Sequence, residues 1–139
     1  MGSGIFKGGL TNHRSLAENL PIVEEKWELS NGCFGKHPKG NHRLVTDIES
    51  EDPIKTANEF YDKMAFGGKT YPIFNNDGSI KGEVAYMKDG SIITIRIITK
   101  TEGKPAVDIN VDGSNQKDDL DGLKSHKIHF TIKEENQND

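Results

Sequence analysis

Two histidines stand three positions apart in the segment LKSHKIHFTIKEE, residues 123–135. Its alternation of apolar and polar residues predicts a β-strand, in which successive side chains point to opposite faces of a sheet. One face carries the apolar set: His126, Ile128, Phe130 and Ile132. The other face carries the polar set: Ser125, Lys127, His129, Thr131 and Lys133. We therefore expect a structural role for His126 and a chemical role for His129.

Two further segments, SIITIRIITKT (residues 91–101) and AVDINV (residues 106–111), divide in the same way. Their alternating isoleucines and valines predict a core face, and the polar residues between them fall on the other face. Those outward polar residues are Thr94, Arg96, Asp108 and Asn110. If the three strands are neighbours, spacings of ~4.8 Å would gather this set on one open face with His129, Lys127 and Thr131.

Such a set of side chains suits the cleavage of RNA by attack of a 2′-hydroxyl on the adjacent phosphate. Histidine can move a proton near neutral pH, so His129 is the candidate general acid or base. Arg96 and Lys127 could stabilise the charge that gathers on the phosphate oxygens. Thr94 and Thr131 could position the phosphate, and Asn110 could contact the substrate. This chemistry needs neither a metal ion nor a cofactor.

The same residues also fit a face that is simply solvated. Threonine, lysine, arginine and asparagine are ordinary residues on the water-facing side of an antiparallel sheet. Asp108 could equally be a salt-bridge partner of Arg96. Residue pattern alone leaves both interpretations open.

A second cationic cluster lies in NGCFGKHPKGNHR, residues 31–43, whose glycines and Pro38 predict a loop. Part of this loop could form one wall of a substrate groove, with the substrate-binding candidates Lys36, His37, His42 and Arg43. A solvated basic loop is the alternative. A metal site built from Cys33, His37 and His42 would lack an obvious fourth ligand. A nucleophilic role for Cys33 has no family signature around it.

The elements that would position these residues can also be read from the sequence. Ser15 and Glu18 have the spacing of a capping box and predict the start of a helix, bent or restarted at Pro21. Asp52 and Pro53 begin a second predicted helix, which Gly67-Gly68 ends. Its expected apolar face consists of Ile54, Ala57, Tyr61 and Met64.

From Lys69 onward the period of the hydrophobic pattern changes to two residues, which is the period of a β-strand. We therefore predict an α+β fold with N-terminal helices packed on a four- to five-stranded antiparallel sheet.

Composition limits the class of protein. At 139 residues the chain has the size of one domain, and no apolar run is long enough for a membrane segment. The formal net charge of −4 argues against a broadly basic nucleic-acid binder. However, residues 31–133 hold 15 basic and 15 acidic side chains, so this part is neutral and could carry a local positive groove. Met1-Gly2-Ser3-Gly4 reads like a remnant of cloning, and we expect the domain to come from a longer protein.

Three segments carry a resemblance to a known group of proteins: DPIKTANEFYDKMAFGGK, MKDGSIITIRIITKTEGKPAVDINV and LKSHKIHFTIKEE. In this order they resemble the C-terminal toxin domains of bacterial polymorphic and contact-dependent toxins. The resemblance covers residues 31–133, with residues 1–30 as an N-terminal helical segment and residues 134–139 as a polar tail. It implies a small ribonuclease of the barnase, EndoU, colicin and RelE-like superfamily, with Thr94, Arg96, Lys127 and His129 in the active site.

The resemblance also implies partners and a location. The substrate would be RNA in the cytoplasm of a competing cell, reached by secretion or delivery as part of a larger protein, and a cognate immunity protein would block the site. The acidic balance departs from many nuclease toxins, which are basic, and indicates a restricted substrate such as tRNA. Two alternatives stay open: a non-enzymatic immunity or protein-interaction module, and a DNA-cleaving toxin.

Overall fold

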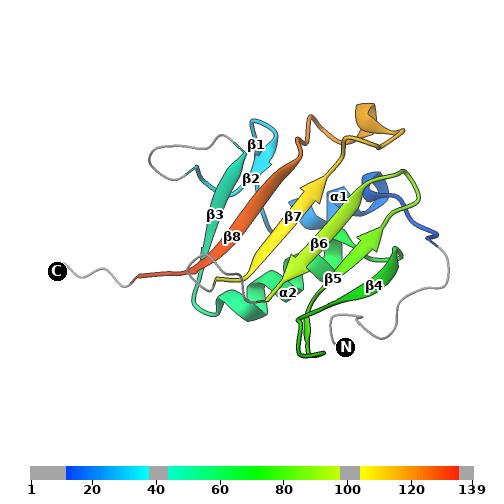
Figure 1. The fold of residues 1–139 in the computed structure, drawn as a ribbon. Coiled ribbons are helices and arrows are strands. Elements are labelled where there is room, and N and C mark those ends of the chain that lie inside the picture. The colour runs from blue at the N-terminus through cyan, green and yellow to red at the C-terminus, as the bar shows by residue number, and fades with distance from the viewer. Residues whose placement is uncertain (1–11, 38–43, 98–103, 135–139) are drawn as a thin grey trace.

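The computed structural model describes residues 12–37, 44–97 and 104–134. Within these ranges, two helices lie on one face of a six-stranded sheet, and a short hairpin lies beside it (Figure 1). The elements in chain order are α1 (Leu16–Glu24), β1 (Leu29–Ser30), β2 (Cys33–Phe34), β3 (Val45–Ser50), α2 (Pro53–Met64), β4 (Lys69–Phe74), β5 (Ile80–Tyr86), β6 (Ile92–Arg96), β7 (Ala106–Asn110), a 3₁₀ turn (Lys117–Asp119) and β8 (His126–Ile132).

The large sheet has the strand order β3-β8-β7-β6-β5-β4. Strands β4 to β8 form an antiparallel meander, as the sequence predicts, whereas β3 lies parallel to β8. The predicted packing of helices on a sheet is therefore present, but the strand count and the purely antiparallel pairing are wrong. The difference comes from β3, because its sequence, VTDIES, alternates too weakly in polarity to be recognised as a strand.

Helix α1 begins as predicted. The Ser15 side chain accepts the backbone N–H of Glu18, and the Glu18 carboxylate accepts the backbone N–H of Ser15, so the capping box is complete. Pro21 lies inside the helix, which ends at Glu24. Trp27 follows it and packs edge-on against Phe60 of α2, with ring centroids 5.2 Å apart.

Helix α2 also begins as predicted, with Asp52 accepting the backbone N–H of Lys55 and Pro53 in the first turn. The predicted apolar face is correct for Ala57, Tyr61 and Met64, which are buried together with Phe60. It is wrong for Ile54, whose exposure is 47%. Ile54 lies in the first turn of α2, and the buried residues of this helix begin at Ala57.

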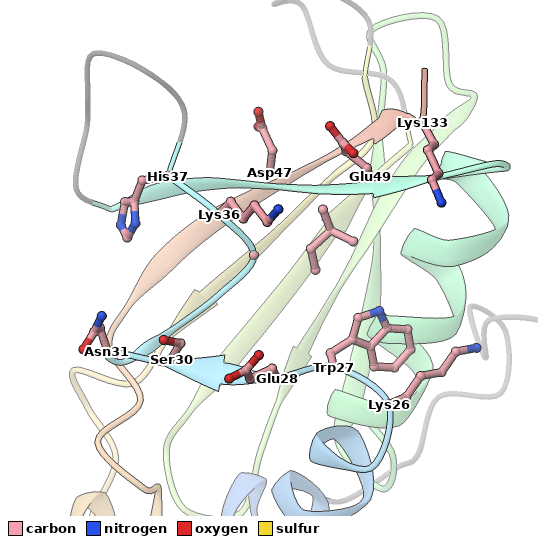
Figure 2. A pocket seen from close by; sticks show the side chains of 12 residues that line it. Lys26, Trp27, Glu28, Ser30, Asn31, Lys36, His37, Asp47, Glu49 and Lys133 are labelled. Atoms are coloured by element: carbon pink, nitrogen blue, oxygen red, sulfur yellow. The ribbon is translucent and has the colours of Figure 1, made fainter. Parts of the chain in front are cut away.

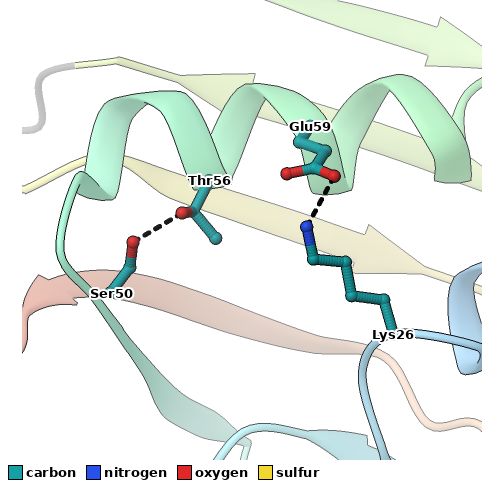
Figure 3. Close-up of polar contacts among 4 residues, drawn as sticks. All are labelled: Lys26, Ser50, Thr56 and Glu59. Atoms are coloured by element: carbon teal, nitrogen blue, oxygen red, sulfur yellow. Dashed lines mark hydrogen bonds and ion pairs between the residues drawn. The ribbon is translucent and has the colours of Figure 1, made fainter.

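Two polar contacts fix α2 against its neighbours (Figure 3). The Ser50 hydroxyl at the end of β3 bonds to the Thr56 hydroxyl, and Lys26 forms an ion pair of 2.7 Å with Glu59. Exposed ion pairs stabilise proteins by about 1 kcal/mol at most, so the helix is held mainly by its buried face. That face joins α1 and the sheet in one core, whose largest fully buried members are Leu16, Leu20, Phe34, Phe60, Tyr61, Met64, Met87, Ile93, Ile95, Leu120, Ile128 and Phe130.

A buried aspartate ties the start of α1 to the β5–β6 turn. Asp89 Oδ1 accepts the Leu16 N–H at 3.0 Å, and Oδ2 accepts the hydroxyls of Ser91 and Ser114 at 2.8 and 2.7 Å. Burial raises the pKa of Asp89, but these hydrogen bonds together with the backbone outweigh it and leave the pKa below its usual value. The folded state therefore favours the ionised carboxylate.

Replacing Asp89 with alanine should lower the free energy of unfolding by about 2–4 kcal/mol, because a buried N–H and two hydroxyls lose their acceptor. Urea denaturation of the parent and variant at pH 7 measures this difference. Asp118→Ala, in the exposed 3₁₀ turn, is the control and should leave the midpoint unchanged. Because the folded-state pKa is lowered, the contribution of Asp89 is present above the ordinary pKa of 3.8 and is lost as the pH falls below it. Equal midpoints for parent and Asp89→Ala would show that the network contributes nothing.

A second buried carboxyl group lies between α2 and the sheet. Glu83 of β5 is fully buried, and its Oε1 accepts the Tyr61 hydroxyl at 2.7 Å. Its Oε2 has no hydrogen-bond partner in the described structure. Burial, which outweighs the opposing Tyr61 hydrogen bond, raises the pKa of Glu83 to about 7, and the nearby Asp62 charge adds to the rise. The folded state therefore favours the protonated acid.

Replacing Glu83 with glutamine should remove a pH-dependent loss of stability. Because the folded-state pKa is raised, the contribution of Glu83 is fully present below pH 4.5 and is lost as the pH rises through about 7. At pH 8 the variant should exceed the parent in unfolding free energy by roughly 1–3 kcal/mol, and the two should converge near pH 4.5. Urea midpoints across this pH range measure the effect. A parent and variant that differ by the same amount at every pH would contradict the assignment.

Candidate active site

The face of the sheet that points away from α1 and α2 is here called the open face. Strand register places side chains in rows across it, because partners on neighbouring strands share a face. One row runs over β6, β7, β8 and β3 through Arg96, Ala106, His129 and Asp47. The next row runs over the same strands through Thr94, Asp108, Lys127 and Val45.

The two histidines lie on the faces that the sequence predicts. His126 is buried on the helix side, opposite Ile109, whereas His129 is half-buried on the open face, opposite Ala106. The three strands that carry the predicted polar side chains are adjacent in the order β8-β7-β6. The open face therefore carries an imidazole and an ammonium group on β8 and a guanidinium group on β6, with β7 between these two strands.

Arg96 is held in place by Asp108. Its Nη1 donates to Asp108 Oδ2 at 3.1 Å, and the two side chains are 40% and 35% exposed. The ion pair that the sequence left as an alternative is thus present. A guanidinium carries five N–H donors, so this bond does not exhaust its capacity to bind an anion. The carboxylate orients the arginine on the open face.

The strand residue between Arg96 and His129 in this row is small. Between them lies Ala106, whose methyl group is itself covered, at 2% exposure. On the other side of Arg96 lies Gly82, where an added Cβ would come within 2.0 Å of the Ile95 carbonyl oxygen. The β-carbons of His129 and Arg96 are two strand spacings apart, ~10 Å. Both side chains are long enough to contact one phosphate group that lies between them.

The remaining predicted residues differ in how close they lie to this row. Thr94 and Lys127 are half-buried and flank Asp108 in the adjacent row. Thr131 is half-buried two residues beyond His129 on the same strand. Asn110 lies apart from them, at the far end of β7, where its Oδ1 accepts the Asp112 N–H in a turn. The structure therefore places Lys127 and Thr131 beside His129 on β8, places Thr94 beside Arg96 on β6, and leaves Asn110 at the rim.

Among the described candidates from the predicted loop, Lys36 lies beside the candidate site. Gly35 has a φ of +91°, and an added Cβ there would lie 2.6 Å from the Asp47 carbonyl oxygen. This close approach lets Lys36 pair with Asp47, donating its N–H at 2.9 Å and accepting that of Asp47 at 2.8 Å. Lys36 thus extends the row of His129 and Asp47 beyond the sheet. His42 and Arg43 lie outside the described residues.

A pocket of about 850 Å³ lies against the outer edge of β3, beside the candidate site (Figure 2). Figure 2 shows Asp47 and Glu49 projecting from one side of β3, while Trp27 and Lys26 lie on the other. The lining residues are Lys26, Trp27, Glu28, Ser30, Asn31, Gly35, Lys36, His37, Asp47, Ile48, Glu49 and Lys133. Its acids and lysines are mixed, and Lys26 is engaged with Glu59. We place the site on the open face, because His129 and Arg96 do not line this pocket.

Asp47 is a site residue that the sequence did not predict. It is the register partner of His129 on the parallel strand β3, and its carboxylate projects on the side of β3 opposite Trp27 (Figure 2). The sequence does contain one signal for Asp47. Val45, Asp47 and Glu49 occupy alternate positions, so they share the outward face once the segment is recognised as a strand.

His126 is fully engaged in the fold. Its Nε2 accepts the Phe34 N–H at 3.0 Å, so Nδ1 carries the proton and donates to the Lys124 carbonyl at 2.7 Å. Burial lowers the pKa of His126, and repulsion from His37 adds to this. Cys33 in the adjacent hairpin is buried as well, and burial raises the pKa of its thiol, the opposite of what a nucleophile needs.

Replacing His126 with alanine should lower the free energy of unfolding by about 2–4 kcal/mol, because the Phe34 N–H loses its acceptor inside the core. Because the folded-state pKa is lowered, the contribution of His126 is present above the ordinary pKa of 6.5 and is lost as the pH falls below it. Thermal unfolding at pH 8 and pH 5 measures both effects. A variant as stable as the parent at pH 8 would contradict the structural role.

Among the described residues, no group of three or more His, Cys, Asp and Glu side chains is placed to hold a metal ion. In the same part of the chain, no helix combines the length and the apolar character needed to cross a bilayer. Comparison of the chain with protein-family models, with curated proteins and with solved structures finds no match.

Proposed function

We propose that the chain is an endoribonuclease toxin domain that cleaves RNA without a metal ion or cofactor. The observation that carries this proposal is the row of Arg96, Ala106 and His129 on the open face, in which a proton-transfer group and a cation can reach the same phosphate. Thr94, Lys127 and Thr131 lie within one or two positions of this row.

The reaction that fits these groups is an internal transfer at phosphorus. The 2′-oxygen forms a bond to phosphorus while the bond to the 5′-oxygen breaks, which leaves a 2′,3′-cyclic phosphate and a free 5′-hydroxyl. The 2′-hydroxyl loses one proton and the 5′-oxygen gains one. His129 carries one of these transfers, as general base or general acid, and water carries the other. Arg96 and Lys127 stabilise the negative charge on the non-bridging oxygens, and Thr94 and Thr131 donate hydrogen bonds to them.

The biological setting follows from the resemblance of the three sequence segments to C-terminal toxin domains. In this setting a larger protein delivers the domain into a competing bacterium, where it cuts cytoplasmic RNA, and a cognate immunity protein protects the producer. The neutral charge of residues 31–133 favours a restricted substrate such as tRNA over general RNA binding.

Expression of the chain in a bacterium tests this function. Growth should stop after induction, and gel analysis should show fragmented RNA with intact plasmid DNA. Nicked plasmid with intact RNA, especially if it depends on magnesium, would instead identify a DNA-cleaving toxin. Normal growth with intact RNA would favour a non-enzymatic interaction module, which the net charge of −4 would suit.

A further inference from the structure

Two tyrosines stand side by side on the open face, on the half of the sheet away from His129. Tyr71 of β4 pairs with Val84, and Tyr86 of β5 pairs with Ile92, so both rings share the face of Thr94 and Arg96. Their exposures are 44% and 41%, and their ring centroids are 5.8 Å apart at an interplanar angle of 72°. Neither ring belongs to the core.

The surroundings of the pair are apolar and cationic. Around it on the open face of β4, β5 and β6 lie Ile73, Val84 and Ile92. The charged residues on the open face of these three strands are Lys69 and Arg96, and both are cations. The Lys69 Nζ lies 5.7 Å from the centre of the Tyr71 ring. The acid of β5, Glu83, is buried on the opposite face.

The pair lies close to the proposed site. Tyr86 is diagonal to Thr94 across the β5–β6 ladder, and Thr94 lies two residues from Arg96 on the same strand. From β5 to β7 the sheet spans ~10 Å. A strand of RNA whose phosphate lies between Arg96 and His129 can therefore place a neighbouring base on the tyrosines.

We propose that Tyr71 and Tyr86 form a stacking platform for a nucleobase of single-stranded RNA, next to the cleaved bond. The inference rests on the proposed function, because it assumes that the RNA cleaved beside His129 also extends over the half of the open face that carries the two tyrosines. Exposed aromatic rings with nearby cations are the combination that binds single strands, since every base has a flat face and every phosphate a negative charge. The cations on this half of the sheet, Lys69 and Arg96, complement the negative phosphates of RNA.

Binding can be separated from cleavage with a short, fluorescein-labelled RNA in which every 2′-hydroxyl is methylated. This probe lacks the attacking hydroxyl, so its fluorescence anisotropy reports affinity alone. Tyr71→Ala and Tyr86→Ala should each weaken binding about ten-fold, the usual cost of losing one base stack. Tyr71→Phe and Tyr86→Phe keep the ring and should bind like the parent. Phe66→Ala is the matched control, because Phe66 is 61% exposed in the helix layer.

His129→Ala distinguishes the two proposals, since its cleavage rate tests the acid–base role, whereas probe binding by the tyrosine variants tests the platform. If this variant still cleaves RNA at the parent rate while the tyrosine variants lose binding, the platform stands and the proposed role of His129 fails. The platform is overturned if the parent does not bind the probe, if the alanine variants bind it like the parent, or if the tyrosines are needed only to bind a protein partner.

Discussion

Replacing His129 with alanine is expected to lower the rate of RNA cleavage by about 10²–10⁴-fold, because the reaction loses its positioned acid or base. The fold should not change, since His129 is half-buried on the open face and is not a member of the core cluster found among the described residues. Cleavage of purified RNA with EDTA present, followed on a denaturing gel, measures the rate. Urea denaturation of the same samples measures stability.

The second histidine of the strand provides the matched control. His126→Ala should lose stability and keep the chemistry of whatever fraction remains folded, because the hydrogen bonds of His126 to described residues go to the Phe34 N–H and the Lys124 carbonyl, inside the fold. The two variants should thus show opposite patterns of activity and stability. A His129→Ala protein that is unstable, or a His126→Ala protein that is stable and inactive, would reverse the assignment.

Replacing Arg96 with alanine is expected to lower the cleavage rate by about 10²–10³-fold, because the charge that develops on the phosphate oxygens loses its partner. Arg96→Lys should recover part of the rate, since it keeps the charge but lacks the planar fork of donors. Stability should change little, because the Arg96–Asp108 pair is partly exposed and such pairs contribute about 1 kcal/mol at most. Single-turnover cleavage of a defined RNA measures the three rates.

Asp108→Asn is the control for this prediction. It removes the ionic partner of Arg96 but leaves the guanidinium in place, so the rate should fall far less than in Arg96→Ala. If the two variants lose activity equally, the ion pair as a unit matters for the fold of the open face, and the direct role of Arg96 in charge stabilisation is wrong.

Much of the site could be predicted from the sequence because strands β6, β7 and β8 have strong alternation. In these strands isoleucine, valine and phenylalanine occupy one face almost without interruption, which decides where His126, His129, Thr94 and Arg96 point. Consecutive antiparallel strands are usually neighbours, so their adjacency also followed from chain order.

Strand β3 could not be predicted by the same means. Its inward positions are Thr46, Ile48 and Ser50, and two of these three are polar, so the alternation that marks a strand is weak. Thr46 is nevertheless fully buried, because its hydroxyl donates to the Phe34 carbonyl. The parallel pairing with β8 joins segments about 80 residues apart in the sequence and leaves no local signal. For this reason Asp47, the neighbour of His129, was missed.

The tyrosine pair was missed for a different reason. Pro72 in the middle of β4 argues against a central strand, and the structure places β4 at the edge of the sheet, where a proline is tolerated. Placing Tyr71 beside Tyr86 requires the register between β4 and β5, in which Lys69 pairs with Tyr86 and Tyr71 pairs with Val84. The register between two strands depends on the packing of the whole sheet, so it cannot be predicted by counting residues along the chain.

The chemical nature of the cleaved ends tests the central claim most directly. Purified parent protein, His129→Ala and Arg96→Ala are each incubated with total RNA in EDTA, and the ends of the fragments are identified by mass spectrometry. The proposal predicts that the parent leaves 2′,3′-cyclic phosphates and 5′-hydroxyls and that both variants leave the RNA essentially intact. Intact RNA with the parent, or equal fragmentation by the parent and His129→Ala, would contradict it.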